Sequence, residues 1–266
     1  MNPVYFASDF HLGVDAHSRS RDREQTIVRW LDFAAKEGAG EIFLVGDLFD
    51  FWFEYRSVVP RGFVRLLGKI AEICDSGIPV RVFTGNHDMW MFGYLEEELG
   101  VTIYRKPVTR TFGDQTFFIG HGDGLGPGDR GYKLLKVVFS NPLCQWLFAR
   151  LHPGLSFSIA QYWSGKSRLA NPETGTFLGP QNEWLLQFAE SHIKNHDVDF
   201  FVFGHRHLPI DYLLSNQHSR YINLGEWLNY NSYAVFDGNS LTIKFFESDN
   251  PYLYSNHLPD LPSTTR

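Results

Sequence analysis

The chain has 266 residues, 43% hydrophobic and 20% charged, so it can bury a full-sized core and is too apolar to be a disordered segment. Its 24 lysines and arginines are outnumbered by 30 aspartates and glutamates, and the formal charge of -6 argues against a protein that grips nucleic acid through phosphates. Two cysteines, Cys74 and Cys144, fit a reducing compartment, and the first residues lack the basic start and apolar run of a secretion signal. We therefore expect a cytoplasmic protein of enzyme size.

The first half of the chain predicts three short buried strands that alternate with two helices. The strands are expected over residues 4–7, 42–45 and 80–83. Apolar residues recur at helical spacing over 27–34 and 63–73, and a glycine follows each stretch. This β-α-β-α-β order indicates strands in one sheet with helices on its faces.

The second half predicts a hairpin, a further helix and several closing strands. The hairpin turns at Gly113-Asp114, and a helix over 181–195 leads into the next strand. The remaining strands are expected over 200–203, over 221–224 and on either side of Asp237-Gly238. Two packed sheets with helices outside would suit this mixture.

A long insertion over residues 129–179, here called the lid, interrupts the strand pattern. Two nearly charge-free segments within it, 137–149 and 151–163, are rich in Leu, Phe and Trp, and each is shorter than the roughly 20 residues that span a bilayer. A helical hairpin that caps the core explains this composition, and so does an apolar face that binds lipid or lies on a membrane. We expect one domain over 1–250, including the lid, and an irregular tail over 251–266.

Five predicted strands end in side chains of the kind that bind metal ions. Residues two apart on a strand face the same side, and the carboxyl ends of strands gather along one edge of a sheet. The candidate ligands are Asp9, His11, Asp47, Asn86, His121, His205 and His207. Seven ligands are too many for one tetrahedral ion, whereas two ions sharing a carboxylate, naturally that of Asp47, would use them all.

The donor set also indicates the kind of metal and chemistry. Carboxylate, amide and imidazole donors without thiolate favour Mn, Fe, Zn or Mg. Two such ions about 3.5–4 Å apart clamp an in-line phosphoryl displacement and make hydroxide near neutral pH. The glycines before the ligands are expected to let the backbone turn sharply. They are Gly46, Gly85, Gly120 and Gly204.

Five sequence blocks together resemble the calcineurin-like metallophosphoesterases. They are D-F-H at 9–11, G-D-L-F-D at 46–50, G-N-H-D at 85–88, G-H-G-D at 120–123 and G-H-R-H at 204–207. The resemblance implies an αββα sandwich of two mixed β-sheets with a dinuclear metal centre. One ion would be held by Asp9, His11, Asp47 and His207, and the other by Asp47, Asn86, His121 and His205.

The lid narrows the resemblance further. Its residues 129–132, Asn141-Pro142 with Gln145 and Phe148, Ile159-Ala160 and Ser167 resemble the lid of the UDP-2,3-diacylglucosamine pyrophosphatases of lipid A synthesis. Those enzymes use Mn²⁺ to split a UDP-linked, diacylated sugar into UMP and the acylated sugar 1-phosphate, with the acyl chains beneath the cap. The resemblance implies a nucleotide-linked glycolipid substrate and peripheral attachment to the cytoplasmic face of the inner membrane, with no protein partner. Substrate contacts would come from Asn86, His87, Asp129, Ser167, Asn171 and His205.

His87 stands where that family usually carries arginine, whereas the broader superfamily has a histidine paired with the following aspartate. We expect His87, held by Asp88, to protonate the leaving oxygen or bind a phosphate oxygen, while Asn86 and His205 stabilise the developing charge. A general phosphodiesterase or phosphomonoesterase with a capped site is the alternative. The filled ligand positions disfavour a non-catalytic scaffold, and the acidic balance disfavours a nuclease.

Overall fold

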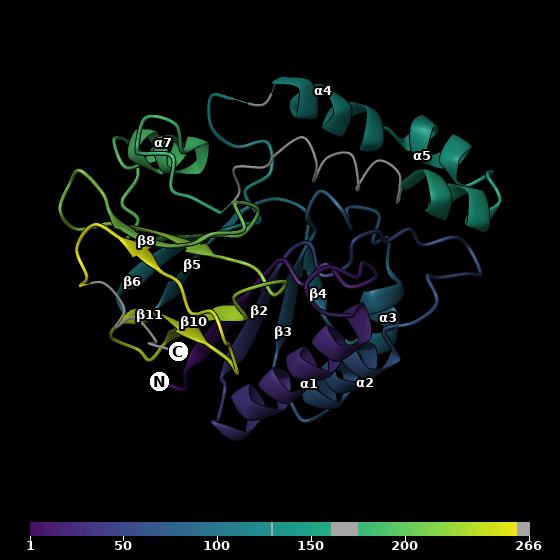
Figure 1. The fold of residues 1–266 in the computed structure, drawn as a ribbon, viewed down its shortest axis with the longest axis horizontal. Coiled ribbons are helices and arrows are strands. Elements are labelled where there is room, and N and C mark those ends of the chain that lie inside the picture. Colours follow the sequence, from purple (N-terminus) through teal and green to yellow (C-terminus); the bar gives the residue numbers. More distant parts are fainter. Residues whose placement is uncertain (129, 161–174, 260–266) are drawn as a thin grey trace.

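Two mixed β-sheets pack face to face at the centre of the molecule, with helices on their outer sides (Figure 1). The structure is a computed structural model that describes residues 1–128, 130–160 and 175–259. Within this part of the chain, both sheets have six strands. The arrangement of two mixed sheets predicted from the sequence is confirmed.

The first sheet combines parallel and antiparallel pairs. Its strands are β1 (Val4–Ala7), β2 (Glu41–Val45), β3 (Val80–Phe83), β4 (Thr102–Tyr104), β10 (Ser232–Phe236) and β11 (Leu241–Phe245). Their order is β11-β10-β1-β2-β3-β4. Strands β1 to β4 run parallel, and β10 pairs antiparallel with β1 and β11. Because β1 and β2 are buried on both faces, their sequences are continuous apolar runs instead of alternating patterns.

The second sheet is mixed in the same way. Its strands are β5 (Val108–Phe112), β6 (Gln115–Ile119), β7 (Phe200–Phe203), β8 (Pro209–Leu213), β9 (Arg220–Leu224) and β12 (Tyr254–Ser255), in the order β12-β8-β9-β7-β6-β5. Strands β6, β7 and β9 are parallel, and β5 and β6 form the predicted hairpin around Gly113-Asp114. The carboxyl ends of β6 and β7 therefore lie at one edge of this sheet.

Aromatic side chains fill the space between the sheets and explain many of the 24 phenylalanines. Phe6 of β1 is fully buried, stacks on Phe43 with ring centroids 5.1 Å apart, and reaches Phe117 of the second sheet at 6.0 Å. Such ring pairs add about 0.5–1.5 kcal/mol beyond the area that they bury. This layer fixes one sheet against the other, and with it the two halves of the site.

Helices cover the outer faces of both sheets (Figure 1). Helices α1 (Ser20–Lys36), α2 (Val64–Asp75) and α3 (Tyr94–Leu99) pack on the first sheet, and α7 (Trp184–His192) packs on the second. In α1 the buried residues Ile27, Trp30, Leu31 and Ala34 form one stripe at helical spacing. The predicted helices thus face the core with the residues that their periodicity selects.

The lid is helical where it is described. It contains α4 (Arg130–Phe139), α5 (Pro142–Phe148) and a helical stretch over 153–160, which lie above the sheets in Figure 1. Asn141 begins α5 by accepting a hydrogen bond from the Leu143 amide at 2.9 Å, and Pro142 occupies the first helical position. Among the described residues, no helix combines the length and apolar character needed to cross a membrane.

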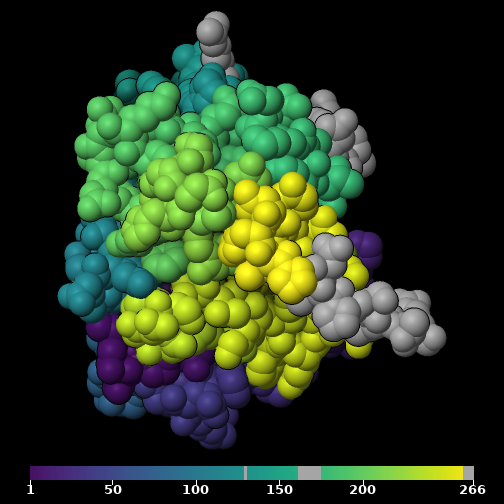
Figure 2. All heavy atoms as spheres, turned by 90° about the vertical axis from the view of Figure 1, so that its left-hand side faces the viewer, coloured from purple at the N-terminus to yellow at the C-terminus, as the bar shows by residue number. Residues whose placement is uncertain are grey.

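The C-terminal segment differs from the irregular tail that the sequence predicts. Tyr254–Ser255 form β12, which pairs in parallel with β8, and the Tyr254 ring stacks on Phe177 at 3.7 Å. Figure 2 shows this yellow segment lying on the molecular surface against the green strands of the second sheet. The sequence signal is weak because only two residues join the sheet, and prolines flank them.

Local sequence patterns do not predict α3, β4 or β8. Helix α3 has six residues and β4 has three, which is too short for a periodic pattern to stand out. Strand β8 starts with Pro209. Proline is rare inside strands and is tolerated as the first residue of one, so its presence hides the strand in the sequence. None of these elements carries a predicted ligand.

Candidate metal centre

The loops after β1, β2, β3, β6 and β7 bring all seven predicted ligands to one edge between the two sheets. β1 to β3 are parallel neighbours in the first sheet, and β6 and β7 are parallel neighbours in the second. Their carboxyl ends therefore face one another across the junction. The structure places the predicted residues together, and their role as ligands stays a prediction.

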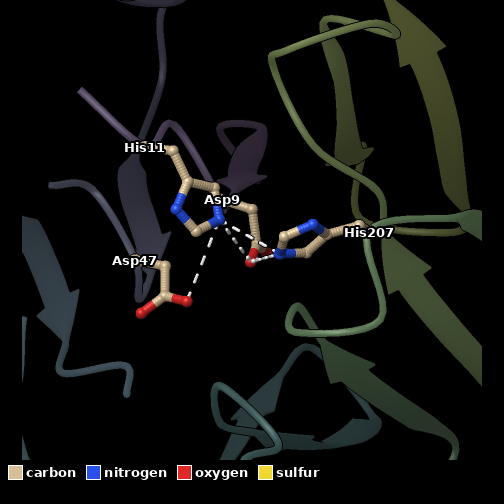
Figure 3. Close-up of side chains that lie close together, drawn as sticks. All are labelled: Asp9, His11, Asp47 and His207. Atoms are coloured by element: carbon tan, nitrogen blue, oxygen red, sulfur yellow. Dashed lines mark hydrogen bonds and ion pairs between the residues drawn. The ribbon is translucent and has the colours of Figure 1, made fainter. Parts of the chain in front are cut away.

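One group consists of Asp9, His11, Asp47 and His207, whose ligand atoms all lie within 4.8 Å of one another (Figure 3). The Nε2 atoms of His11 and His207 are 3.0 Å apart, and His207 Nε2 lies 3.1 Å from Asp9 Oδ1. His11 Nε2 lies 3.9 Å from Asp47 Oδ2. Two imidazoles and two carboxylates that point at one spot form a donor set suited to a divalent cation.

A second group shares the same carboxylate. Oδ2 of Asp47 lies 3.3 Å from His121 Nε2. The amide oxygen of Asn86 lies 3.2 Å from His121 Nε2 and 2.9 Å from His205 Nδ1. His121 Nδ1 donates to the Val45 carbonyl at 2.8 Å, which leaves Nε2 to face the site as a ligand. Asp47 thus lies between the two groups, where the ligand count predicts a shared carboxylate.

Buried atoms without partners test whether cations fit here. Asp9 is 0% exposed and Asp47 is 1% exposed. Oδ1 of Asp9 and Oδ2 of Asp47 have no hydrogen-bond partner, although buried charges are normally paired. The two oxygens that lack a partner are those aimed at the histidine nitrogens. The residues therefore fit a dinuclear site for divalent cations.

The ligand loops hold an unusual backbone conformation. Positive φ angles occur at Asp9 (56°), His11 (45°), Asp47 (52°), His205 (65°) and His207 (58°). Residues other than glycine rarely adopt this region, and each instance costs about 1–3 kcal/mol. Backbone hydrogen bonds between neighbouring loops hold two of these residues, from Asp9 N to Gly46 O and from His11 N to Asp47 O, both at 3.0 Å. The strain falls on the predicted ligands themselves.

The glycines beside the ligands serve mainly to leave space, which corrects the expectation of sharp turns at all four. Only Gly46 has a positive φ, at 85°. A Cβ atom at Gly85 would overlap the Asp47 carboxylate, and one at Gly204 would overlap the Asp9 carboxylate. At Gly120 a Cβ would lie 2.9 Å from the Pro107 ring. Close approach between loops therefore explains three of these glycines.

His87 is held differently from the sequence-based expectation. Asp88 accepts hydrogen bonds from the backbone amides of Gly85 at 2.8 Å and Leu48 at 2.7 Å, so its carboxylate ties two loops together. His87 Nδ1 instead donates to the backbone carbonyl of Asp50 at 3.0 Å. The expected pairing of His87 with Asp88 is therefore wrong, because backbone amides occupy both oxygens of Asp88.

Three supporting residues escape the sequence analysis. Arg23 of α1 is buried and donates to the carbonyls of Phe10 at 2.8 Å and His11 at 2.7 Å, which fixes the first ligand loop. Arg206 lies between two predicted ligands and makes a double hydrogen bond to Glu183, at 2.9 and 3.0 Å. Both contacts join residues distant in the chain, and no motif or period marks them.

The protonation of the histidines depends on the buried carboxylates. Burial opposes charge on His11, but the nearby carboxylates of Asp50, Asp9 and Asp47 outweigh it and raise the pKa of His11 to about 10. Burial also opposes charge on His121, yet the Asp47 carboxylate raises the pKa of His121 well above its usual value. Burial and the His121 imidazole lower the pKa of His205 to about 4. In the metal-free protein these shifts favour the cationic forms of His11 and His121 and the neutral form of His205.

Three residues expected to bind substrate, Asp129, Ser167 and Asn171, lie outside the described residues. The other three, Asn86, His87 and His205, lie at the centre. His87 packs edge-on against His11 with ring centroids 5.0 Å apart.

A family model described as calcineurin-like phosphoesterase matches residues 3–209. The chain therefore belongs to the calcineurin-like phosphoesterase family, as the five motifs predict.

Its relatives include a protein of Porphyromonas gingivalis named UDP-2,3-diacylglucosamine hydrolase, 40% identical over 92% of this chain and 97% of the relative. A protein of the same name from Aeromonas hydrophila is 26% identical over 86% of this chain and 92% of its own length. Among solved structures, a phosphoesterase from E. coli gives a TM-score of 0.48 at 17% identity, covering 92% of this chain and 93% of that chain. The predicted resemblance to UDP-2,3-diacylglucosamine hydrolases is confirmed.

Replacing Gly85 by alanine should weaken metal binding. The added methyl group would displace the Asp47 carboxylate, the position shared by both groups of ligands. We expect the metal affinity to fall by about 10–100-fold, as measured by metal analysis after dialysis and by the metal-induced rise in Tm. Gly68→Ala is the matched control, because a Cβ at this position inside α2 would meet no atom within 4 Å. Wild-type affinity in Gly85→Ala would contradict the bridging position of Asp47.

Metal loading should release protons. His11 and His121 are protonated in the metal-free protein and must become neutral to bind a cation. We expect release of about two protons at pH 7, and an apparent affinity that rises with pH, measured by calorimetry in buffers of different ionisation enthalpy. His11→Gln should lower the proton count by about one, whereas His205→Gln should leave it unchanged because His205 is already neutral. A count near zero in the wild-type protein would refute this picture.

Proposed function

We propose that the protein hydrolyses the pyrophosphate bond of UDP-2,3-diacylglucosamine, giving UMP and 2,3-diacylglucosamine 1-phosphate in lipid A biosynthesis. The observation that carries the proposal is an aromatic cluster under the lid, formed by Phe51, Phe53, Trp90, Phe139, Phe148 and Phe157. Phe51 directly follows Asp50, whose carboxylate lies 3.7 Å from His11 Nδ1. The aromatic cluster, which we propose to contact the acyl chains, thus lies beside the predicted metal centre. The relative named UDP-2,3-diacylglucosamine hydrolase supports the same substrate.

Two divalent ions, which we propose to be Mn²⁺, would be held by Asp9, His11, Asp47 and His207 and by Asp47, Asn86, His121 and His205. The mixed oxygen and nitrogen donors suit this ion. When bound, the ions would supply Lewis acidity and a hydroxide nucleophile near neutral pH.

The protein's own residues position the pyrophosphate for attack at the phosphorus nearest uridine. The Asn86 amide oxygen faces His121 and His205, which leaves its two N–H groups for a phosphate oxygen. His87 donates through Nδ1 to Asp50, and burial lowers the pKa of His87. An anionic phosphate beside Nε2 favours protonation there, so His87 would bind a phosphate oxygen. A sugar phosphate leaves without a proton, and we therefore assign His87 to phosphate binding.

We further propose that the lid attaches the protein peripherally to the cytoplasmic face of the inner membrane. Several large apolar side chains of the lid are exposed, and such side chains can mark a membrane interaction site. They include Leu134, Leu143, Trp146, Leu147 and Leu155. The Arg150 guanidinium lies over the Trp146 ring at 4.7 Å, and such an amphipathic pair suits the headgroup region.

Product analysis tests the proposed reaction. Mass spectrometry of a reaction with UDP-2,3-diacylglucosamine, Mn²⁺ and ¹⁸O-labelled water should detect UMP carrying the label and unlabelled acyl-sugar 1-phosphate. Asp47→Asn should reduce the rate at least about 100-fold, because it removes charge from the shared ligand. Turnover of simple aryl phosphates, with none of the UDP-linked lipid, would instead identify a general phosphodiesterase or phosphomonoesterase.

Two substitutions in α5 should separate acyl recognition from membrane attachment. Phe148 packs on Trp90 at 5.3 Å within the aromatic cluster, whereas Trp146 is 54% exposed. Phe148→Ala should raise KM for the diacylated substrate about tenfold and spare an aryl phosphodiester, since it removes about 3 kcal/mol or less of apolar contact. Trp146→Ala should reduce sedimentation with anionic vesicles and leave KM for detergent-dispersed substrate unchanged. Equal loss on both substrates for Phe148→Ala would make the lid only structural.

A further inference from the structure

A cavity of about 520 Å³ lies beside the metal centre, between α4 and the loops after β3, β4 and β6. The predicted ligand His121 forms part of its wall, so the cavity adjoins the second group of ligands. Its size falls within the 300–1,000 Å³ range of sites for small molecules. The mechanism derived above makes no use of this space.

The cavity is strongly basic in a chain whose formal charge is -6. Among the described residues, its charged lining consists of Arg105, Lys106, Lys133, Lys136 and the carboxylate of Asp123. Asp123 pairs with Lys136 at 2.5 Å, and Arg105 pairs with Glu96 at 3.9 Å and donates to the Met91 carbonyl. Lys133 donates to the Gly126 carbonyl, and Lys106 makes no hydrogen bond or ion pair within the described ranges. The cavity therefore presents donors and positive charge to whatever enters it.

Helix α4 separates this cavity from the aromatic cluster. Lys133, Lys136 and Val137 line the cavity from one face of the helix, at spacings of three and four residues. Phe139 lies on another face and packs against Trp90 at 5.2 Å. Helix α4 thus contributes to the basic cavity through one face and to the aromatic cluster through another.

We propose that this basic cavity binds the nucleoside monophosphate half of the substrate. The inference rests on the proposed function and extends it to a binding site for the second half of the molecule. Uracil carbonyls, ribose hydroxyls and phosphate oxygens are acceptors, and lysine and arginine supply donors only. Pro107, Leu125 and Val137 add apolar wall against which a flat ring can lie. The acylated half would then lie toward the aromatic cluster.

Substitution of the two lysines tests the site. We expect Lys106→Gln and Lys133→Gln each to weaken UMP binding about five- to tenfold, measured by calorimetry with the Mn²⁺-loaded protein at low salt. The value of kcat/KM for the UDP-linked lipid should fall by a similar factor. Inhibition by 2,3-diacylglucosamine 1-phosphate, the metal content and turnover of an aryl phosphodiester should all stay within twofold of wild type. Lys244→Gln, which changes an exposed side chain of β11, is the control for loss of one positive charge elsewhere.

Several results would overturn the inference. Wild-type UMP affinity in both variants would do so, and so would a lack of UMP binding by the loaded wild-type protein. If the variants lost affinity for the acyl-sugar phosphate instead, the basic cavity would serve the other half of the substrate. Should the wild-type protein fail to hydrolyse the UDP-linked lipid, the proposed function would fall. Lysine-dependent UMP binding in that same protein would still support a nucleotide site.

Discussion

Two buried carboxylates at the junction of the sheets impose the constraint on which the site depends. Removing a carboxylate from water costs several kcal/mol, so Asp9 and Asp47 require positive charge beside them. In the metal-free protein the imidazoles of His11 and His121 supply that charge, because the carboxylates raise the pKa of both. Divalent cations would take over this role once bound. The same imidazoles thus neutralise the site before metal arrives and offer ligand atoms afterwards.

The rest of the fold stabilises a geometry that the ligand loops would not adopt alone. Five predicted ligands have positive φ angles, at about 1–3 kcal/mol each. Several contacts offset this cost locally: Arg23 binds the carbonyls of the first loop, and Glu183 fixes the loop that carries Arg206. The aromatic layer around Phe6 fixes the position of one sheet relative to the other. Predicted ligands that follow strands of different sheets therefore lie close together. The packing of the core therefore helps to stabilise the strained backbone of the ligand loops.

Local sequence patterns predict the ligands but not the contacts that support them. Asp9, Asp47 and His121 each follow a buried strand closely, and parallel topology then brings strand ends together. Contacts such as Arg23 with His11, or Glu183 with Arg206, depend on how distant segments pack. The periodicity of a local sequence segment carries no information about such packing. The sequence also does not reveal why residue 85 is glycine. The structure explains it, because a Cβ at this position would overlap the Asp47 carboxylate. Elements as short as β4 fall below the length at which a period is visible.

The metal centre alone does not select a substrate, since its residues provide chemistry suited to many phosphoesters. If the proposed function is right, the surfaces around the metal centre must select the substrate. Helix α4 contributes to two of these surfaces. Lys133 faces the basic cavity while Phe139 faces the aromatic cluster, and a helix holds these side chains at a fixed separation. When one half of the proposed substrate binds at its surface, the position of the other half is therefore also restricted. On the proposed function, this single helix would align the pyrophosphate across the site, while the sheets hold the ligand loops in place.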